Sequence, residues 1–294
     1  SKLYISSIQN LLKNEKKRSP NYSAKSNRLP IIRQYLSEIG NPQERNTVHI
    51  AGSKGKGSVA SYISRALGDI GMRVGVYSSP HLSDWRERVQ VNHEFVDDDQ
   101  LAKSINLVIE VAPDSATFFD LLTASAFYSF SEMSLDCMVI EVGLGGRFDS
   151  TNVLQPIASL VTSIELEHSD VLGDSLSKIA YQKGGIYKKG SQLWCASEVP
   201  VEAKKVLREI ADTFNQKLNV ATYPELVAPD TPNFFASNKT LAVSVLASLG
   251  EPYSQGVDFL NNTSFDDLNL PGRFELRYSK EGRPIIFDVA HSPK

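Results

Sequence analysis

Short apolar runs alternate with stretches of helical periodicity along most of this 294-residue chain from residue 47 onward. The short runs indicate buried strands, and the longer stretches indicate helices. Strands that alternate with helices predict an α/β fold, a mostly parallel sheet with helices on both faces. The expected strands are residues 47–51, 73–77, 136–142, 157–164 and 192–196, with 89–91 as part of another. The expected helices are residues 58–69, 101–111, 118–130, 176–188, 201–214 and 238–249.

The length allows about two domains. Residues 219–233 predict a loop because they are rich in proline and lack periodicity. Residues 251–272 predict a linker because they contain Pro252, Gly256, Pro271 and Gly272. A new strand is expected at 284–288, so we place a domain boundary near residue 270. Residues 1–270 then form the main α/β domain, and 271–294 supply the first strand of a second one.

Composition excludes several classes of protein. A hydrophobic fraction of 41% with 22% charged residues is that of a globular protein and excludes a largely disordered chain. The net charge of −3 argues against nucleic acid as a main partner. No apolar run approaches the length of a membrane span, and no secretory signal is evident. The two cysteines cannot form a zinc finger or a disulfide framework, so we expect a reducing cytoplasm.

A glycine-rich loop follows the first expected strand and leads directly into a helix. In such a loop, backbone amides converge on phosphate oxygens, a lysine neutralises charge, and the helix N-terminus adds its dipole. The spacing differs from the standard phosphate-loop motif, and the alternative is a tight turn whose glycines serve packing alone. The seven loop residues are Gly52, Ser53, Lys54, Gly55, Lys56, Gly57 and Ser58.

Polar groups also follow three other expected strands, at the sheet edge where α/β proteins bind ligands. They are Ser79 with His81, Glu141 at the end of an apolar run, and Glu167 with His168, with Lys183 on the next helix. A carboxylate that ends a buried strand is costly unless it is paired or binds a cation, so Glu141 suggests Mg²⁺. The alternatives are a capping or ion-paired Glu141 and structural histidines.

Taken together, eight stretches resemble the folylpolyglutamate synthase/dihydrofolate synthase family, a branch of the ATP-dependent Mur ligases. The resemblance extends from about residue 20 to residue 294. The stretches are HIAGSKGKGSVAS, YSSPHL, RERVQVN, ATFFDLLTASAF, IEVGLGGRFDSTNV, EHSDVLGDSLSKIAYQKGGIYKKG, LPGRFE and FDVAHSP.

The resemblance implies an ATP-dependent amide ligase in folate biosynthesis. ATP would activate the carboxylate of dihydropteroate, or of a folate's glutamate tail, as an acyl phosphate that L-glutamate attacks. It also implies an ATP-binding domain of the Mur-ligase central type over 1–270. The C-terminal glutamate-ligase domain is then represented only by 271–294. Residues 82–100 and 145–156 are expected to shape the pterin site, and a monomer without nucleic-acid or membrane partners is expected.

Residue roles follow from the same resemblance. Lys56, Lys183 and His168 are the expected catalytic residues, and the seven loop residues bind ATP. Ser79 and Glu141 would hold one Mg²⁺, and Glu141 with His168 a second. Lys183 matches a lysine that is carbamylated in this family, which makes it a metal ligand. Further ATP contacts are expected from Asn238, Arg273, Asp288 and His291.

The sequence departs from the family pattern at several positions. The loop motif GTNGKGS carries Ser53 and Lys54 here, and the TFFE-like motif ends in the shorter Asp120. Val289 replaces a glycine of the motif DGAHNP. The sequence ends at Lys294, where the family continues for an ordinary small domain, so the second domain is expected to be truncated. These departures keep two alternatives open: an ATP-binding fragment or degenerate paralogue without ligase activity, and another Mur-type ligase.

Overall fold

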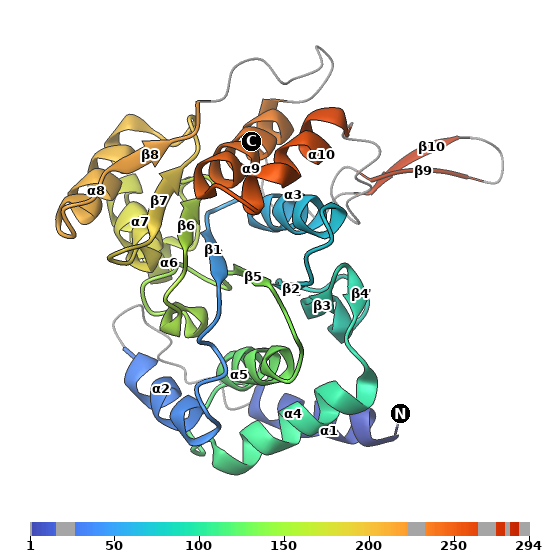
Figure 1. The fold of residues 1–294 in the computed structure, drawn as a ribbon. Helices are drawn as coiled ribbons and strands as arrows, with labels where there is room; N and C mark the ends of the chain where they lie inside the picture. Colours follow the sequence, from blue (N-terminus) through green and yellow to red (C-terminus); the bar gives the residue numbers. More distant parts are fainter. Residues whose placement is uncertain (1, 16–26, 223–232, 264–274, 280–282, 288–294) are drawn as a thin grey trace.

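One eight-stranded sheet organises the chain in the computed structural model, which describes residues 2–15, 27–222, 233–263, 275–279 and 283–287. Its strands are β1 (Thr47–Ala51), β2 (Val74–Tyr77), β3 (Val89–Val91), β4 (Glu94–Phe95), β5 (Cys137–Glu141), β6 (Ala158–Val161), β7 (Gln192–Cys195) and β8 (Leu218–Val220). They lie in the order β4-β3-β2-β5-β1-β6-β7-β8 (Figure 1). All pairings from β2 to β8 are parallel, and only β3 and β4 join antiparallel. The predicted mostly parallel α/β sheet is confirmed.

Helices cover both faces of this sheet, as predicted. They are α1 (Lys2–Glu15), α2 (Leu29–Glu38), α3 (Lys56–Asp69), α4 (Asp98–Val111), α5 (Phe118–Ser131), α6 (Ser169–Leu172), α7 (Leu176–Lys183), α8 (Val201–Asp212), α9 (Asn233–Leu249) and α10 (Gly256–Asn262). Figure 1 shows α3, α9 and α10 on one side of the central strands and α1, α2, α4 and α5 on the other. Among the described residues, no helix is both long and apolar enough to cross a membrane.

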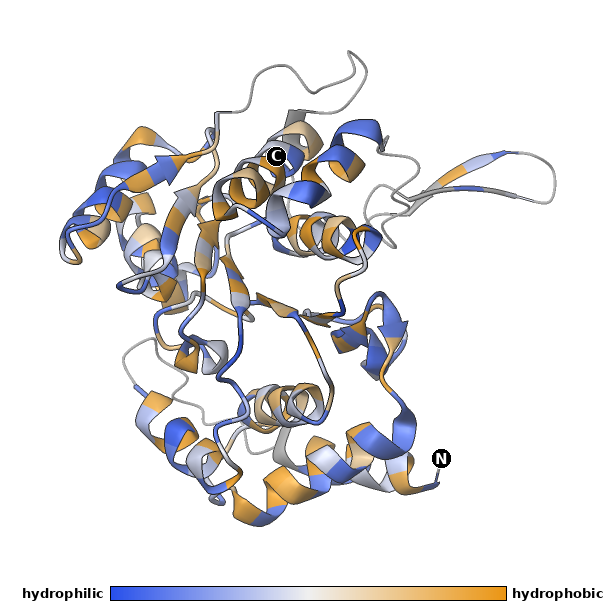
Figure 2. Cartoon of the chain, in the orientation of Figure 1, coloured by the Kyte–Doolittle hydropathy of each residue, from blue (hydrophilic) through white to orange (hydrophobic). Residues whose placement is uncertain are grey.

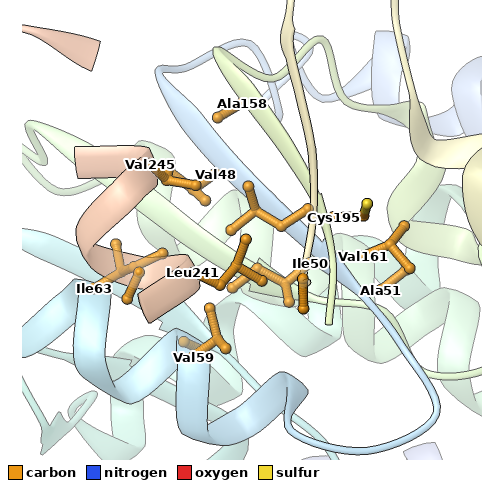
Figure 3. Packing of buried hydrophobic residues seen from close by; sticks show 14 of the residues in the cluster. Val48, Ile50, Ala51, Val59, Ile63, Ala158, Val161, Cys195, Leu241 and Val245 are labelled. Atoms are coloured by element: carbon orange, nitrogen blue, oxygen red, sulfur yellow. The ribbon is translucent and has the colours of Figure 1, made fainter. Parts of the chain in front are cut away.

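The core has two parts because side chains alternate along each strand. Val48 and Ile50 of β1 pack toward α3 and α9 in one buried cluster (Figure 3). Met138 and Ile140 of β5 belong to the second cluster, with residues of α4 and α5. Hydrophobic colouring runs along the central strands (Figure 2), as expected for strands buried on both faces. Both cysteines are buried free thiols in strands.

Two predictions around α9 need correction. The loop expected at 219–233 begins with a strand, because β8 pairs in parallel with β7. This edge strand was missed because three residues are too few to show a period. α9 starts at Asn233, five residues before the predicted start at 238. Residues 223–232 of the predicted loop lie outside the described residues.

The linker predicted at 251–272 is wrong over its first half. Tyr253–Gln255 form a 3₁₀ helix, and α10 follows at once. Leu260 is fully buried, and Gly256 lies so close to the Ala66 backbone of α3 that an ideal Cβ would be 2.9 Å from its oxygen. Here glycine permits close helix contact instead of marking a flexible segment.

Two further elements differ from the predictions. The helix expected at 176–188 ends at Lys183, and a 3₁₀ helix, Gly184–Ile186, replaces its end. The strand expected at 284–288 is β10 (Pro284–Phe287), which pairs antiparallel with an unpredicted strand, β9 (Glu275–Tyr278). The edge of β10 is therefore paired by β9. The proposed boundary near 270 lies outside the described residues and stays a prediction.

Candidate nucleotide and metal site

Four adjacent strands bring the predicted site segments to one edge of the sheet. β2, β5, β1 and β6 are neighbours and all parallel, so their carboxyl ends point the same way. The glycine-rich loop 52–58, the predicted phosphate loop, follows β1, and Ser79 follows β2. Glu141 ends β5, and the segment 162–168 follows β6. This order explains why segments more than a hundred residues apart, such as 52–58 and 162–168, come together.

The glycines of the phosphate loop are required by its surroundings. An ideal Cβ on Gly52 would lie 1.8 Å from Thr162 Oγ1, so only glycine fits beside β6. Gly55 has a left-handed φ of 81°, and a Cβ there would lie 2.3 Å from Asn238 Oδ1. Asn238, on α9, is buried at 8% exposure. The structure therefore places this predicted ATP-contact residue directly against the loop.

The segment after β6 holds the loop in place. The Ser53 amide donates to Ser163 O at 2.9 Å, and the Lys54 amide donates to Ser163 Oγ at 2.8 Å. The Glu165 amide donates to Ser53 Oγ at 3.0 Å. Lys54 Nζ lies 2.9 Å from Glu165 Oε2, so the lysine that departs from the family motif is ion-paired. Glu165 was expected among the polar groups that follow this strand, but the contacts of residues 162–165 with the loop were not predicted, because the partners are distant in sequence.

Lys56 and Ser58 occupy the first turn of α3. Lys56 Nζ donates to Gly52 O at 3.0 Å and therefore folds back over the loop. Ser58 is buried at 3% exposure. Gly55 caps the helix without a side-chain hydrogen bond. Uncapped amides at the start of a 14-residue helix, together with a lysine, fit a phosphate group.

Ser79 and Glu141 adjoin each other as predicted. The Ser79 amide donates to Glu141 Oε2 at 3.2 Å. Glu141 is 3% exposed, and its strand neighbour in register is Ile50 of β1. A buried carboxylate beside a hydroxyl residue and a phosphate loop supplies the hard oxygen donors that Mg²⁺ prefers.

Lys183 forms a buried ion pair that the sequence did not reveal. Its Nζ lies 2.8 Å from Glu167 Oε1, and the lysine side chain is 2% exposed. Burial lowers the pKa of Lys183 to about 8, and the charge of Lys56 acts in the same direction. Burial raises the pKa of Glu167, but attraction to Lys183 and hydrogen bonds outweigh burial and lower it overall. Lys56 and Lys183 are thus electrostatic neighbours.

His168 is exposed at the start of α6, where it adopts a left-handed φ of 43°. Within the described part of the chain, no three His, Cys, Asp or Glu residues are grouped for a metal ion. The predicted set of Ser79, Glu141, His168 and Lys183 contains only two such residues, so its metal role stays a prediction. Arg273, Asp288 and His291 lie outside the described residues.

An aromatic and cationic cluster lies beside the Ser79 segment. The rings of His81 and Trp85 are 4.3 Å apart, and Trp85 meets Phe118 edge-on at 5.1 Å. Arg88 donates to His81 Nδ1 at 2.8 Å and lies over the Trp85 ring at 5.3 Å. Arg88 and Phe118 belong to the quoted motifs, and Trp85 and Arg88 lie within the segment 82–100 that is expected to shape the pterin site. Nothing in the sequence indicates that these three side chains meet.

Asp120, the shortened end of the TFFE-like motif, contacts three separate segments. It caps α5 with Thr117, accepts from Ser150 Oγ at 2.7 Å, and pairs with Arg28 Nη2 at 2.9 Å. The carboxylate is 3% exposed and thus acts as a structural junction. It ties α5 to the segment before α2 and to the 3₁₀ helix Ser150–Val153.

We expect Gly55→Ala to weaken nucleotide binding more than it weakens folding. A Cβ at this φ costs about 1–2 kcal/mol, and the clash must displace Asn238 or the loop. Gly71→Ala is the matched control, because Gly71 has a φ of 85° with nothing within 4 Å of its Cβ position. ATP titration and thermal unfolding of both variants measure the difference. Equal nucleotide affinity in the two variants would contradict a binding role for this loop.

Comparisons with known proteins concern the sequence and the fold, and no protein-family model matches the chain. A dihydrofolate synthase/folylpolyglutamate synthase of Buchnera aphidicola is 31% identical over 258 residues, covering 83% of this chain and 61% of the relative. A folylpolyglutamate synthase structure from Thermotoga maritima has a TM-score of 0.79 at 29% identity, covering 98% of this chain and 71% of that one.

A second solved structure is a bifunctional folylpolyglutamate synthase/dihydrofolate synthase with Mn, AMPPNP and L-glutamate bound. Its TM-score is 0.76 at 28% identity, and the match covers 90% of this chain and 67% of that one. The chain spans between 45% and 61% of the length of the first curated relatives that it matches. The shared sequence and the shared Mur-ligase-type fold identify the folylpolyglutamate synthase/dihydrofolate synthase family as the family that this chain resembles.

Proposed function

We propose that the chain binds Mg·ATP and joins L-glutamate to a folate-type carboxylate through an acyl phosphate. The acceptor is dihydropteroate, the glutamate tail of a folate, or both. The observation that carries the proposal is the phosphate loop with Lys56, which lies one strand away from the buried Glu141–Ser79 pair. The resemblance to folylpolyglutamate synthases supports the same chemistry. Phosphoryl transfer depends mainly on positioning and charge neutralisation, and this edge of the sheet provides both.

The loop residues bind and orient the nucleotide in this proposal. The amides of 52–58 and the start of α3 hold phosphate oxygens, and Lys56 exchanges its contact with Gly52 O for the transferring phosphate. Asn238 limits the space beside Gly55 and adjoins the nucleotide. Arg273, Asp288 and His291 are proposed as further ATP contacts from a second domain that starts near residue 271.

A divalent cation fits the donor set at the β2–β5 edge. Glu141 and Ser79 would hold one Mg²⁺, and Glu141 with His168 and a carbamylated Lys183 would hold a second. When bound, Mg²⁺ neutralises phosphate charge as phosphoryl transfer proceeds. The chain itself keeps Glu141 buried and orients it with the Ser79 amide.

The lowered pKa of Lys183 supports the proposed carbamylation, because only the neutral amine attacks CO₂. A C–N bond forms, and the amine loses a proton. With a pKa of about 8, the neutral fraction rises from about a tenth at pH 7 to about nine tenths at pH 9. The product is a carbamate next to the Glu167 carboxylate, and two adjacent anions favour a metal cation.

We expect a ¹³C carbamate signal from labelled bicarbonate to increase between pH 7 and pH 9 and to disappear in Lys183→Met. Lys188 needs a control, because burial lowers its pKa to about 8 as well. Lys188→Met should keep the signal. A signal that persists in Lys183→Met and vanishes in Lys188→Met would contradict the assignment.

The acceptor is proposed to bind beside the His81–Trp85–Phe118 cluster, within segments 82–100 and 145–156. Flat aromatic rings and the Arg88 guanidinium suit a planar pterin with an anionic tail. We propose small-molecule substrates as the partners, with the protein acting as a monomer in the cytoplasm. The buried free thiols of Cys137 and Cys195 support a reducing compartment.

Mass spectrometry of the products tests the proposal. Mg·ATP and L-glutamate are supplied with dihydropteroate or a reduced folate in parallel reactions. A mass increase of one glutamate establishes the ligase and names its acceptor. Mg·ATP binding without product from either acceptor would favour a nucleotide-binding protein without ligase activity. Product only from a cell-wall type carboxylate would assign another Mur-type ligase.

A further inference from the structure

We propose that His49 is a positioning residue that fixes the acceptor side of the site through Thr151 and Asp149. This inference rests on the proposed function. His49 lies in the middle of β1, three residues before the phosphate loop, and is fully buried. Its Nε2 is 2.9 Å from Thr151 Oγ1 in the 3₁₀ helix Ser150–Val153. The strand that carries the phosphate loop is therefore linked by side chains to the segment after β5.

The direction of each hydrogen bond follows from the donors available. Thr151 Oγ1 donates its one hydrogen to Asp149 Oδ1 at 2.5 Å. The threonine oxygen can then only accept from His49, so the imidazole carries its hydrogen on Nε2. Burial lowers the pKa of His49 to about 3, with a smaller contribution from Lys188, so the ring is neutral at physiological pH. Among the described residues, Nδ1 has no hydrogen-bond partner.

Asp149 links Thr151 by hydrogen bonds to the glycine-rich segment after Glu141. The carboxylate is 1% exposed and accepts from the Leu144 amide at 3.0 Å and the Thr151 amide at 3.0 Å. Burial raises the pKa of Asp149, and these donors oppose the shift. The neighbouring Gly143 packs on Phe119, since an ideal Cβ there would lie 2.4 Å from the ring. His49, Thr151 and Asp149 thus set the position of the segment beside α5.

A histidine at this position is costly for folding alone. An apolar residue would suit a strand buried on both faces, and the orphan Nδ1 is a desolvated acceptor. The compensation is the Nε2 hydrogen bond that orients Thr151. This series of hydrogen bonds runs from His49 to Leu144, which follows Glu141 on the side where the acceptor is proposed to bind. Loss of the His49 hydrogen bond should therefore weaken acceptor binding more than ATP binding.

Two variants at position 49 separate positioning from packing. His49→Gln places an amide donor where Nε2 lies, whereas His49→Leu fills the space without a donor. We expect the acceptor KM to rise about five- to tenfold in His49→Leu and less than twofold in His49→Gln, with the ATP KM nearly unchanged in both. Thr151→Val removes the same link from the other side. The double variant His49→Leu/Thr151→Val should cost less than the sum of the single changes.

The outcomes also distinguish this inference from the proposed function. Wild-type protein that forms no product with either acceptor contradicts the function, and the kinetic comparison then has no baseline. NMR of the ¹⁵N-labelled imidazole still tests His49 without any activity. The inference requires a neutral ring that is protonated on Nε2 and does not titrate down to pH 5. Active wild type with equal acceptor KM in His49→Leu and His49→Gln, or additive effects with Thr151→Val, would overturn the positioning role.

Discussion

Replacing Lys56 with Met is expected to lower glutamate-dependent ADP formation by about 10²- to 10³-fold, the cost of losing one well-placed charge at a transferring phosphate. In the described structure, Lys56 Nζ reaches back over the loop to Gly52 O at 3.0 Å, so its position is set by the loop itself. Methionine keeps the length and removes the charge. Coupled ADP assays and ATP titration separate the loss in turnover from any loss in binding.

A second readout follows from the charge of Lys56. Since Lys56 lowers the pKa of Lys183, the Lys56→Met change should raise that pKa and shift the carbamate signal to higher pH. Lys178→Met is the matched control, because this lysine side chain is 62% exposed and pairs with Asp174, which lies just before α7. Wild-type turnover in Lys56→Met would rule out the phosphate role of this loop.

Glu141→Gln should raise the Mg²⁺ concentration needed for half-maximal activity by about a hundredfold or more, the scale on which metal affinity responds to its ligand environment. Glutamine has the same size as Glu141 and still offers an oxygen to the Ser79 amide, so local packing is preserved. The lost quantity is therefore the negative charge. Activity measured against Mg²⁺ concentration gives the shift, and thermal unfolding shows whether the fold is intact.

Glu110→Gln is a suitable control for this experiment. Glu110 is an exposed carboxylate on α4, and its neutralisation changes the net charge by the same amount. An unchanged Mg²⁺ dependence in Glu141→Gln would show that the buried carboxylate is an ion-paired or capping group. That was the alternative left open by the sequence.

Local signals in the sequence were sufficient for the long elements of the sheet and its helices. Residues 47–51 were predicted as a strand and form β1, since a short run rich in β-branched residues before a glycine-rich turn is typical of a strand. The failures share a cause. β8 and β9 are three and four residues long, and α10 owes its place to contact with α3, so tertiary packing decided these elements.

Site residues that lie within one contiguous segment could be predicted, whereas contacts between residues distant in sequence could not. The loop 52–58 is contiguous, so its composition alone suggested phosphate binding. The Lys183–Glu167 pair and the clamp by Ser163 depend on how α7 and the segment after β6 approach the loop. Glu141 was singled out because an acid at the end of a buried strand is physically unusual.

The pairing of β1 has a consequence for the order in which the chain folds during synthesis. Both neighbours of β1 come much later, since Thr47 pairs with Met138 of β5 and Val48 with Ala158 of β6. At roughly 5–20 residues per second, about 5–20 s pass before the first partner of β1 is made. During that interval α3, the next helix, is available to cover one face of β1, since its Val59 and Ile63 join Val48 and Ile50 in one buried cluster. Packing of α3 on β1 is thus expected to protect the strand that carries the glycine-rich loop against aggregation before its partner strands are made.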